Sequence, residues 1–332
     1  MTKIFGFITT LSLLDEQDTF FLFLNEALTR VGWEVYVFDA DDLFEDGEMV
    51  KAKKVEHPLT YGTRLELAVK ETVIPLKNFD VIFLKKDPPI DAVFNRLLSA
   101  LMRLEVPTVN APAGLLEMGT KAYLKHFSQY TVQTFYVREG EEALSAIRGL
   151  KDCVLKQSDS YGGKGVIHIS WDEKSFYHYQ GSKKVALSEQ ELRQKVQDYL
   201  SKSRDGVMLV VRFLSSAAKR GDKRVVILDG EILGSYIRLP AVETGICECA
   251  NNGARLCLPT EQDRALVADL RPHLKKHGIV VAALDLLVDE EGVEKLSEIN
   301  IINPGFCNLH VLHPELNIAK HVIDAVQAKR RV

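Results

Sequence analysis

An aspartate, Asp285, lies in the middle of the apolar segment VVAALDLLV near the C-terminal end of the chain. A carboxylate buried there needs a cation, a metal ion or several hydrogen-bond donors beside it, because an unpaired buried charge is strongly unfavourable. If residues 289–292 form a four-residue hairpin loop, Glu298 and Asn300 project from the same face as Asp285, since side chains on one face recur every two residues. A three-residue loop would instead turn the acids to opposite faces.

Two carboxylates and an amide on one hairpin form a set of hard oxygen ligands. Mg²⁺ is usually held by one or two carboxylates and completes its octahedron with water and nucleotide phosphates, so this set predicts a magnesium site. The alternative is a surface hairpin with solvated acids, which suits Glu290, Glu291 and Glu294 better than Asp285 with its apolar neighbours.

A second segment, residues 153–166, has the pattern of a strand, a glycine-rich loop and a return strand. Its glycines would let backbone N–H groups approach a polyphosphate closely, and its lysines would neutralise that anion. It is not a Walker A loop, because no Ser or Thr follows Lys164 and a strand comes next. Taken alone, the segment could equally be a hairpin with a glycine turn. Its candidate nucleotide-binding residues are Lys156, Ser160, Tyr161, Gly162, Gly163 and Lys164.

Three further basic residues could reach the same anion. Lys121 lies at the start of a predicted helix, Arg224 at the start of a predicted strand and Arg238 at the end of another. Each of them alone is more often a solvated cation. Because the strands around Arg224 and Arg238 are apolar, we expect these two guanidiniums to point into a cleft and to hold phosphoryl or carboxylate oxygens bidentately.

The elements that position these residues begin with a βαβ unit, in which Asp18 is the candidate N-cap of the helix. Together with the elements that follow, this unit predicts a small doubly wound domain. The domain lacks the G-x-G-x-x-G fingerprint of dinucleotide binding, because Gly6 stands alone. Its strands are expected at residues 3–8, 33–38, 80–84 and 107–109, and its helices at 18–31 and 91–103.

From about residue 120 the mixture of helices and strands is typical of an α+β fold. We expect residues 171–186 to form an exposed loop and the Asp229-Gly230 pair to form a tight turn. The chain then divides into domains at 1–118, 119–205 and 206–332. Helices are expected at 120–128, 140–148, 188–201 and 261–277, and strands at 132–137, 153–156, 165–169, 207–213, 223–229, 231–237, 279–288 and 294–301.

Composition narrows the class of protein. The 332 residues are 46% hydrophobic and 27% charged, with a net charge of −4, which argues against disorder and against nucleic acid as the main partner. There is no apolar run of about 18 residues and no signal-like start, so we expect a cytoplasmic chain with no membrane partner. We expect free thiols at Cys153, Cys247, Cys249, Cys257 and Cys307, because neither the Cys247/Cys249 pair nor the His310/His313 pair has a metal-site pattern around it.

Taken together, these residues resemble the ATP-grasp superfamily, and the bacterial glutathione synthetases in particular, over nearly the whole chain. The resemblance implies an ATP-grasp fold, α/β and α+β, with a doubly wound N-terminal domain, a small central lid domain and a C-terminal antiparallel-sheet domain. The matching segments are Lys86-Asp87-Pro88-Pro89, Val109-Asn110-x-Pro112, Lys121, Lys156 with Gly162-Gly163, Gly221-Asp222-Lys223-Arg224-Val225, Asp229-Gly230-Glu231, Arg238-x-Pro240, Leu284-Asp285 and Glu298-Ile299-Asn300.

Carried over by position, the resemblance implies that Lys121 and Lys156 bind ATP phosphates and that residues 160–165 cover the triphosphate as a lid. Asp285, Glu298 and Asn300 would hold two Mg²⁺ ions, with Mn²⁺ as an alternative.

The resemblance also implies that Arg224 stabilises an acylphosphate and that the adenine lies on a linker near residues 210–214. Val211 and Phe213 are the candidate contacts there.

This chain has Val211 and Arg212 where members usually carry an acidic or amide side chain in the linker. It also lacks an arginine that members carry in the segment here numbered 243–249. Its Asn303-Pro304-Gly305-Phe306 is more similar to the acceptor loop of D-alanine–D-alanine ligases.

The expected reaction joins a carboxylate to an amine at the expense of ATP. Phosphoryl transfer to a carboxylate makes an acylphosphate that an amine can displace, and positioning with charge neutralisation supplies the catalysis. Small-molecule substrates such as γ-glutamylcysteine and glycine, and a homo-oligomeric enzyme, follow from the resemblance. The alternatives are a peptide ligase for other amino acids and a non-catalytic nucleotide-binding regulatory module.

Overall fold

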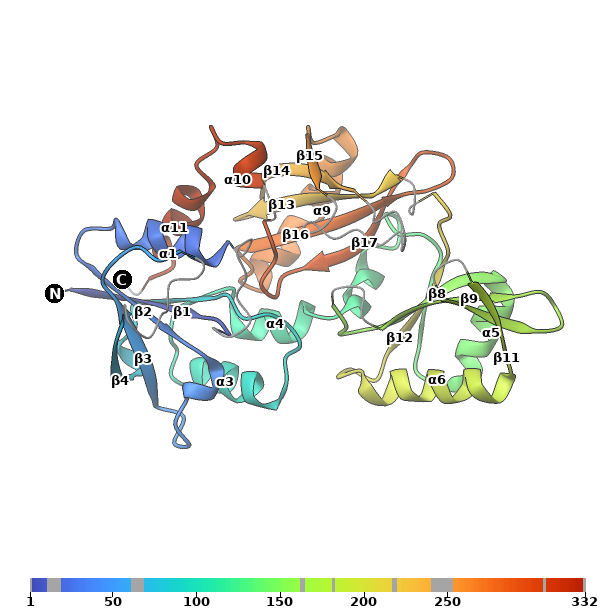
Figure 1. Cartoon of the computed structure of the whole chain (residues 1–332), viewed down its shortest axis with the longest axis horizontal. Coiled ribbons are helices and arrows are strands. Elements are labelled where there is room, and N and C mark those ends of the chain that lie inside the picture. Colours follow the sequence, from blue (N-terminus) through green and yellow to red (C-terminus); the bar gives the residue numbers. More distant parts are fainter. Residues whose placement is uncertain are drawn as a thin grey trace.

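The structure, a computed structural model, describes residues 2–10, 19–60, 69–161, 165–180, 183–216, 220–239, 253–306 and 309–330. Within these ranges the strands form three sheets, which follow one another along the chain (Figure 1). In the same ranges no helix is both long enough and apolar enough to cross a membrane. The domain boundaries expected at 118 and 205 remain predictions; β12 (Met208–Arg212), which follows the second boundary, pairs within the second sheet.

The first sheet has the strand order β4-β3-β2-β1-β5-β6 and confirms the doubly wound domain. Parallel β1, β2, β5 and β6 match the expected strands, while β3 and β4 form an antiparallel hairpin at the edge that the sequence reading missed. The N-cap of α1 is Thr19, not Asp18, which lies outside the described residues. The elements are β1 (Lys3–Ile8), α1 (Phe20–Leu28), β2 (Trp33–Phe38), η2 (Ala40–Asp42), β3 (Met49–Val55), β4 (Val69–Pro75), η3 (Leu76–Asn78), β5 (Val81–Leu84), α3 (Ala92–Arg103), β6 (Thr108–Val109) and α4 (Pro112–Met118).

The second sheet has the order β11-β10-β9-β8-β12-β7, and α5 and α6 share a buried cluster with it. The helix expected at 120–128 is a 3₁₀ helix, η4, and the other helices and strands expected before residue 171 are present. The elements are η4 (Lys121–Phe127), β7 (Thr134–Val137), α5 (Gly140–Leu150), β8 (Asp152–Gln157), β9 (Val166–Trp171), β10 (Phe176–Gln180), β11 (Lys183–Leu187), α6 (Glu189–Lys202) and β12.

The prediction of an exposed loop at 171–186 was wrong, because β10 and β11 form an antiparallel hairpin there. Phe176 faces Leu187 at the base of this hairpin, and both are buried against the core of the second sheet. Beyond this pair the hairpin is polar and only partly buried. The apolar alternation that identifies a strand is therefore too short to recognise in the sequence.

The third sheet has the order β15-β14-β13-β16-β17 and is antiparallel throughout. The tight turn between β13 and β14 is confirmed, with φ of 50° at Asp229 and 83° at Gly230. α11 returns to the N-terminal domain and packs against α1 and β5 (Figure 1). The elements are β13 (Asp222–Leu228), β14 (Glu231–Arg238), β15 (Ala254–Cys257), α9 (Glu261–Lys276), β16 (Val281–Val288), β17 (Glu294–Asn300), α10 (Leu309–Leu312) and α11 (Ile318–Ala328).

Asn110 joins the first sheet to the third. Its side-chain amide donates to the carbonyl oxygens of Val281 at 2.7 Å and Ile301 at 2.8 Å, and its Oδ1 accepts from the N–H groups of Val280 and Val281 at 2.8 Å each. The residue is 3% exposed. The Asn110 side chain thus makes all four of its possible hydrogen bonds with backbone groups at the ends of β16 and β17, the two strands that carry the predicted metal ligands.

Replacing this side chain is expected to destabilise the protein. We expect Asn110→Ala to lower the free energy of unfolding by roughly 2–4 kcal/mol, because it leaves several buried backbone groups without partners. Urea unfolding measures the effect. The matched control is Asn95→Ala, on the exposed side of α3, for which we expect a change within about 0.5 kcal/mol. Equal stability of the two variants would contradict the proposed role of Asn110.

Candidate functional site

Four buried charges lie together on one face of the third sheet. Arg224 on β13 is directly opposite Asp285 on β16, and Asp222 at the start of β13 is directly opposite Arg238 at the end of β14. Each of the four is at most 8% exposed. Arg224 donates through Nε to Asp285 Oδ1 at 2.7 Å and through a second nitrogen to Oδ2 at 2.8 Å. Both arginines therefore lie in the interior and each has a carboxylate partner, while the expectation that they point into a cleft and hold substrate oxygens remains a prediction.

Asp285 has the most hydrogen-bond and ion-pair partners of these four groups. Its Oδ2 also lies 3.0 Å from a guanidinium nitrogen of Arg238 and accepts a hydrogen bond from the Asn300 amide at 3.0 Å. Burial alone would raise the pKa of the Asp285 carboxyl, but Arg224 and Arg238 outweigh burial and leave that pKa well below its usual range. Asp285 is therefore ionised at neutral pH and is held in a fixed orientation.

The β16–β17 hairpin brings Glu298 and Asn300 to the face of Asp285, by a different route from the one expected. The loop has five residues, 289–293, and not four. A regular ladder from such a loop would place Ser297 opposite Asp285 and turn Glu298 away. A bulge in β17 shifts the register, so Glu298 lies directly opposite Asp285 and not diagonal to it. The predicted shared face is confirmed, while the predicted register was wrong.

Lys121 connects this hairpin to the glycine-rich segment. Its Nζ lies 3.0 Å from Glu298 Oε1 and also donates to the carbonyl oxygen of Ser160. The Lys121 side chain is 7% exposed. These residues border a small pocket formed by segments that follow strands of all three sheets. It is lined by Pro88, Gly119, Thr120, Lys121, Ser158, Asp159, Ser160, Tyr161, Glu298, Ile299, Asn300, Ile301 and Ile302. Ser160 and Tyr161 therefore lie beside the predicted metal ligands.

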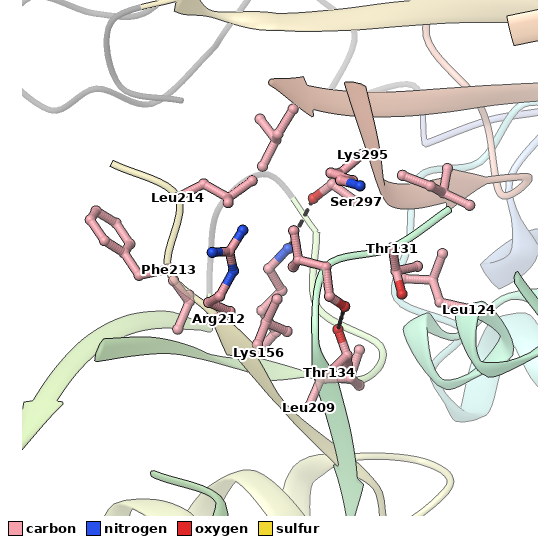
Figure 2. A pocket seen from close by; sticks show the side chains of 15 residues that line it. Leu124, Thr131, Thr134, Lys156, Leu209, Arg212, Phe213, Leu214, Lys295 and Ser297 are labelled. Carbon is pink, nitrogen blue, oxygen red and sulfur yellow. Dashed lines mark hydrogen bonds between the residues drawn. The ribbon is translucent and has the colours of Figure 1, made fainter. Parts of the chain in front are cut away.

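Lys156, at the end of β8, donates a hydrogen bond from Nζ to Ser297 Oγ at 3.0 Å (Figure 2). Burial lowers the pKa of Lys156, while the nearby carboxylates of Glu298 and Asp285 oppose that shift. Because Ser297 is the bulged residue of β17, one local irregularity both turns Glu298 inward and provides the partner of Lys156. Nothing in the sequence pattern identified Ser297 as part of the site.

A pocket of about 600 Å³, open to solvent, lies between the second and third sheets beside Lys156. Its walls are mainly apolar, which suits the flat face of a base. Val211 lines it, but the ring of Phe213 is turned away from Lys156 (Figure 2) and stacks on His168, with ring centroids 3.8 Å apart. The lining residues are Leu124, Thr131, Val132, Thr134, Val154, Lys156, Leu209, Val211, Arg212, Phe213, Leu214, Leu287, Lys295, Leu296 and Ser297.

The linker that follows β12 is tied to the tip of the β16–β17 hairpin. Glu290 accepts hydrogen bonds from the N–H of Ser215 at 3.1 Å and from its hydroxyl at 3.4 Å, and it lies 3.4 Å from a guanidinium nitrogen of Arg212. An acidic side chain therefore reaches the linker from another element. The sequence reading assigned Glu290 to solvent and did not connect it with the linker.

The residues present suit a hard divalent cation. Within the described ranges no three His, Cys, Asp or Glu side chains gather as a metal site, so His310 and His313 form no such group. Asp285, Glu298 and Asn300 provide two carboxylates and one amide, and Mg²⁺ commonly completes a set of this kind with phosphate and water oxygens.

Some of the expected residues lie outside the described parts of the chain. These are Gly162, Gly163 and Lys164 of the glycine-rich segment, the segment 243–249, Pro240 and three cysteines, Cys247, Cys249 and Cys307. Cys153 and Cys257 are free thiols, as expected, and burial raises the pKa of Cys153 to about 12.

Comparison with solved structures defines the class of protein. The chain superposes on the D-cycloserine synthetase DcsG with a TM-score of 0.62 at 16% identity, covering 98% of this chain and 99% of the other. For D-alanyl-alanine synthetase A from Vibrio cholerae the TM-score is 0.62 at 13% identity, with 99% of each chain covered. For the ATP-grasp ligase PsnB, solved with its minimal precursor, Mg and ADP, the TM-score is 0.55 at 13% identity over 98% and 97% of the chains. The fold is that of the ATP-grasp ligases.

Sequence comparison narrows the class further. The family model for the prokaryotic glutathione synthetase ATP-grasp domain matches residues 120–312, and the model for the N-terminal domain of the same family matches residues 7–115. Glutathione synthetase from Pseudomonas aeruginosa is 27% identical over 323 residues, which cover 95% of this chain and 93% of that protein. The enzyme from Escherichia coli K12 is 26% identical over 325 residues, covering 95% and 94%. The chain belongs to the prokaryotic glutathione synthetase family.

It is therefore an ATP-dependent, ADP-forming ligase that makes amide bonds, as the sequence predicted. ATP-grasp ligases use ATP with a divalent metal ion, generally Mg²⁺, and act on small molecules. The roles of individual site residues in this chain remain predictions.

We expect Lys156→Met to raise the Kd for ATP by about 10- to 100-fold, because a charged hydrogen bond to phosphate contributes roughly 1.5–3 kcal/mol. Isothermal titration with ATP and Mg²⁺ measures this. The control is Lys151→Met, whose lysine is exposed near the start of the same strand and pairs with Glu173. Equal affinity in the two variants would remove Lys156 from the nucleotide site.

Proposed function

We propose that this protein joins γ-glutamylcysteine to glycine, forming an amide bond through an acylphosphate. The observation that carries the proposal is the continuous set of contacts from Arg238 through Asp285 and its hairpin to Lys121 and Lys156. This set of contacts includes the residues proposed to hold metal and reaches, at Lys156, the apolar pocket that suits a base. Family membership supports the choice of substrates, since the curated relatives are glutathione synthetases.

In the proposed mechanism, the apolar pocket beside Val211 holds the adenine, and Lys156 and Lys121 bind the phosphates. Ser160 and Tyr161 border the phosphates. Arg224 and Arg238 hold the oxygens of the acylphosphate while the amine attacks its carbonyl carbon. The acylphosphate forms when the γ-phosphoryl group passes from ATP to the carboxylate and ADP is released. When the amine attacks, the carbon–nitrogen bond forms, the bond from the carbonyl carbon to the phosphate oxygen breaks, phosphate leaves and the amine loses its proton. The catalytic contribution is positioning and charge neutralisation.

Asp285, Glu298 and Asn300 are the residues we propose for the metal. Two Mg²⁺ ions, or Mn²⁺ in their place, would neutralise the phosphate oxygens when bound. Glu298 also contacts Lys121, which places the proposed metal ligand next to a proposed phosphate ligand. The donor chemistry of the three side chains supports this assignment.

The acceptor side of the site involves the loop that begins at Asn303. The side-chain amide of Asn303 donates to Asp87 Oδ1 at 2.5 Å, and the carbonyl oxygen of Gly305 accepts from Arg224 at 3.3 Å. The loop thus touches both an N-terminal motif and a proposed catalytic arginine. Its similarity to the acceptor loop of D-alanine–D-alanine ligases favours a second candidate, a ligase that uses another amino acid as the amine. Cytoplasmic location and a homo-oligomeric state remain predictions.

A screen for ADP release across carboxylate and amine pairs tests the proposal. We expect γ-glutamylcysteine with glycine to give amine-dependent ADP and a product of the mass of the tripeptide. ADP release with γ-glutamylcysteine and a different amine would favour the second candidate. Nucleotide binding without amine-dependent release for any pair would favour the regulatory module.

We expect Asp285→Asn and Glu298→Gln each to lower kcat by roughly 100-fold or more while the protein stays folded, because each removes a negative charge from the proposed metal site. Steady-state ADP release and circular dichroism measure the two effects. The control is Glu291→Gln, an exposed residue in the loop of the same hairpin, which should keep the wild-type rate. Near-normal turnover in both site variants would refute the metal assignment.

A further inference from the structure

Asp222 is a buried carboxylate that the proposed mechanism does not use. It begins β13, is 8% exposed and lies directly opposite Arg238. Arg238 donates to it through Nε at 2.6 Å and through a second guanidinium nitrogen, so the pair is bidentate. This geometry is among the strongest and most directional that a guanidinium can make with a protein carboxylate.

The two arginines of the site compete for one other carboxylate. Both contact Asp285, Arg224 through two hydrogen bonds and Arg238 through one nitrogen 3.0 Å from Oδ2. Two buried guanidiniums side by side repel each other and need two negative charges nearby. Asp222 and Asp285 supply these charges, and the four groups together are neutral.

The two aspartates have different numbers of hydrogen-bond partners. Asp285 Oδ2 accepts from Arg224 and Asn300 and also faces Arg238, whereas Asp222 accepts both of its hydrogen bonds within the cluster from Arg238 and also feels the charge of Arg224 nearby. Without the charge of Asp222, the bidentate fork of Arg238 would find its nearest carboxylate at Asp285. The single contact of Arg238 with Asp285 would then become bidentate, in stronger competition with any metal ion.

We propose that Asp222 is a positioning residue: it anchors Arg238 and limits the contact of Arg238 with Asp285 to one nitrogen, so that Asp285 can exchange its arginine contacts for a divalent cation. The inference rests on the proposed function, since it takes Arg238 as a catalytic group and Asp285 as a metal ligand. It adds a residue with a distinct role, because Asp222 acts through Arg238 and touches neither substrate nor metal.

The same strand offers a matched control on its other face. Lys223 points away from the cluster and forms a buried ion pair with Asp263, which is 0% exposed. Breaking either pair leaves a buried cation without one of its partners, with a similar cost to stability. Only the pair of Asp222 and Arg238 borders the proposed metal site, so the two variants separate stability from positioning.

The experiment compares Asp222→Asn, Arg238→Gln, the double variant and Asp263→Asn. For Asp222→Asn we expect kcat to fall about 10- to 100-fold and the Mg²⁺ concentration for half-maximal rate to rise several-fold. Calorimetry of Mn²⁺ binding in the presence of ADP should show the same weakening without turnover. For Asp263→Asn we expect a lower unfolding temperature with unchanged Mg²⁺ dependence and Mn²⁺ affinity.

The double variant tests whether Asp222 acts through Arg238. We expect its kcat to be within about threefold of that of Arg238→Gln, since a residue that acts only through another adds nothing once the other is gone. In the double variant Asp285 keeps Arg224 and Asn300 as partners and no arginine is left without its carboxylate, so this variant serves even where Asp222→Asn does not fold. A double variant at least tenfold slower than Arg238→Gln would overturn the inference.

Two other results would also overturn it, and they distinguish its failure from that of the proposed function. Wild-type Mg²⁺ dependence and Mn²⁺ affinity in folded Asp222→Asn, with Arg238→Gln strongly impaired, would refute the role of Asp222 alone. Full activity of Arg238→Gln would refute both the proposed role of Arg238 and the inference built on it.

Discussion

The rest of the site depends on the buried carboxylate of Asp285. In an apolar strand it persists as an anion because Arg224 on the neighbouring strand and Arg238 one strand further both reach it. Removing one partner of such a cluster leaves an uncompensated charge in the interior, so the four charged residues constrain one another. This constraint fixes the relative position of β14, β13 and β16, and with them the face on which any chemistry can occur.

The hairpin after Asp285 extends this constraint to the second sheet. The bulge at Ser297 turns Glu298 toward Asp285 and leaves the Ser297 hydroxyl within reach of Lys156. Lys121 then joins Glu298 to the glycine-rich segment. One irregular residue in β17 therefore links the second and third sheets at the site, beside the contacts that Glu290 makes with Arg212 and Ser215.

The sequence was sufficient for the parts of this arrangement that depend on local pattern. Apolar periodicity identified the main strands and helices, and the cost of burying a charge singled out Asp285. The sequence pattern indicated neither the extra residue in the loop nor the extra residue in β17. These two one-residue shifts cancel, so Glu298 still lies on the predicted face. Asp222 was read only as part of a motif, since its contact with Arg238 depends on strands pairing side by side. Asn110 was likewise a motif residue, and its four hydrogen bonds are made to residues 170 to 191 positions later in the chain.

The charge pattern of the site also bears on how substrates enter it. Arg224 and Arg238 are paired with aspartates, and Lys121 with Glu298, so these cations already have anionic partners from the chain. A triphosphate that entered alone would have to displace these carboxylates and leave them buried near its own negative charge. Under the proposed assignment, a triphosphate that enters with its metal ions would instead exchange partners: the metal ions would pair with the carboxylates, and the phosphates with the lysines and arginines. The net charge of the interior then changes little, which keeps the desolvation cost of binding low. The mutual neutralisation of the site therefore favours the metal–nucleotide complex over the free nucleotide.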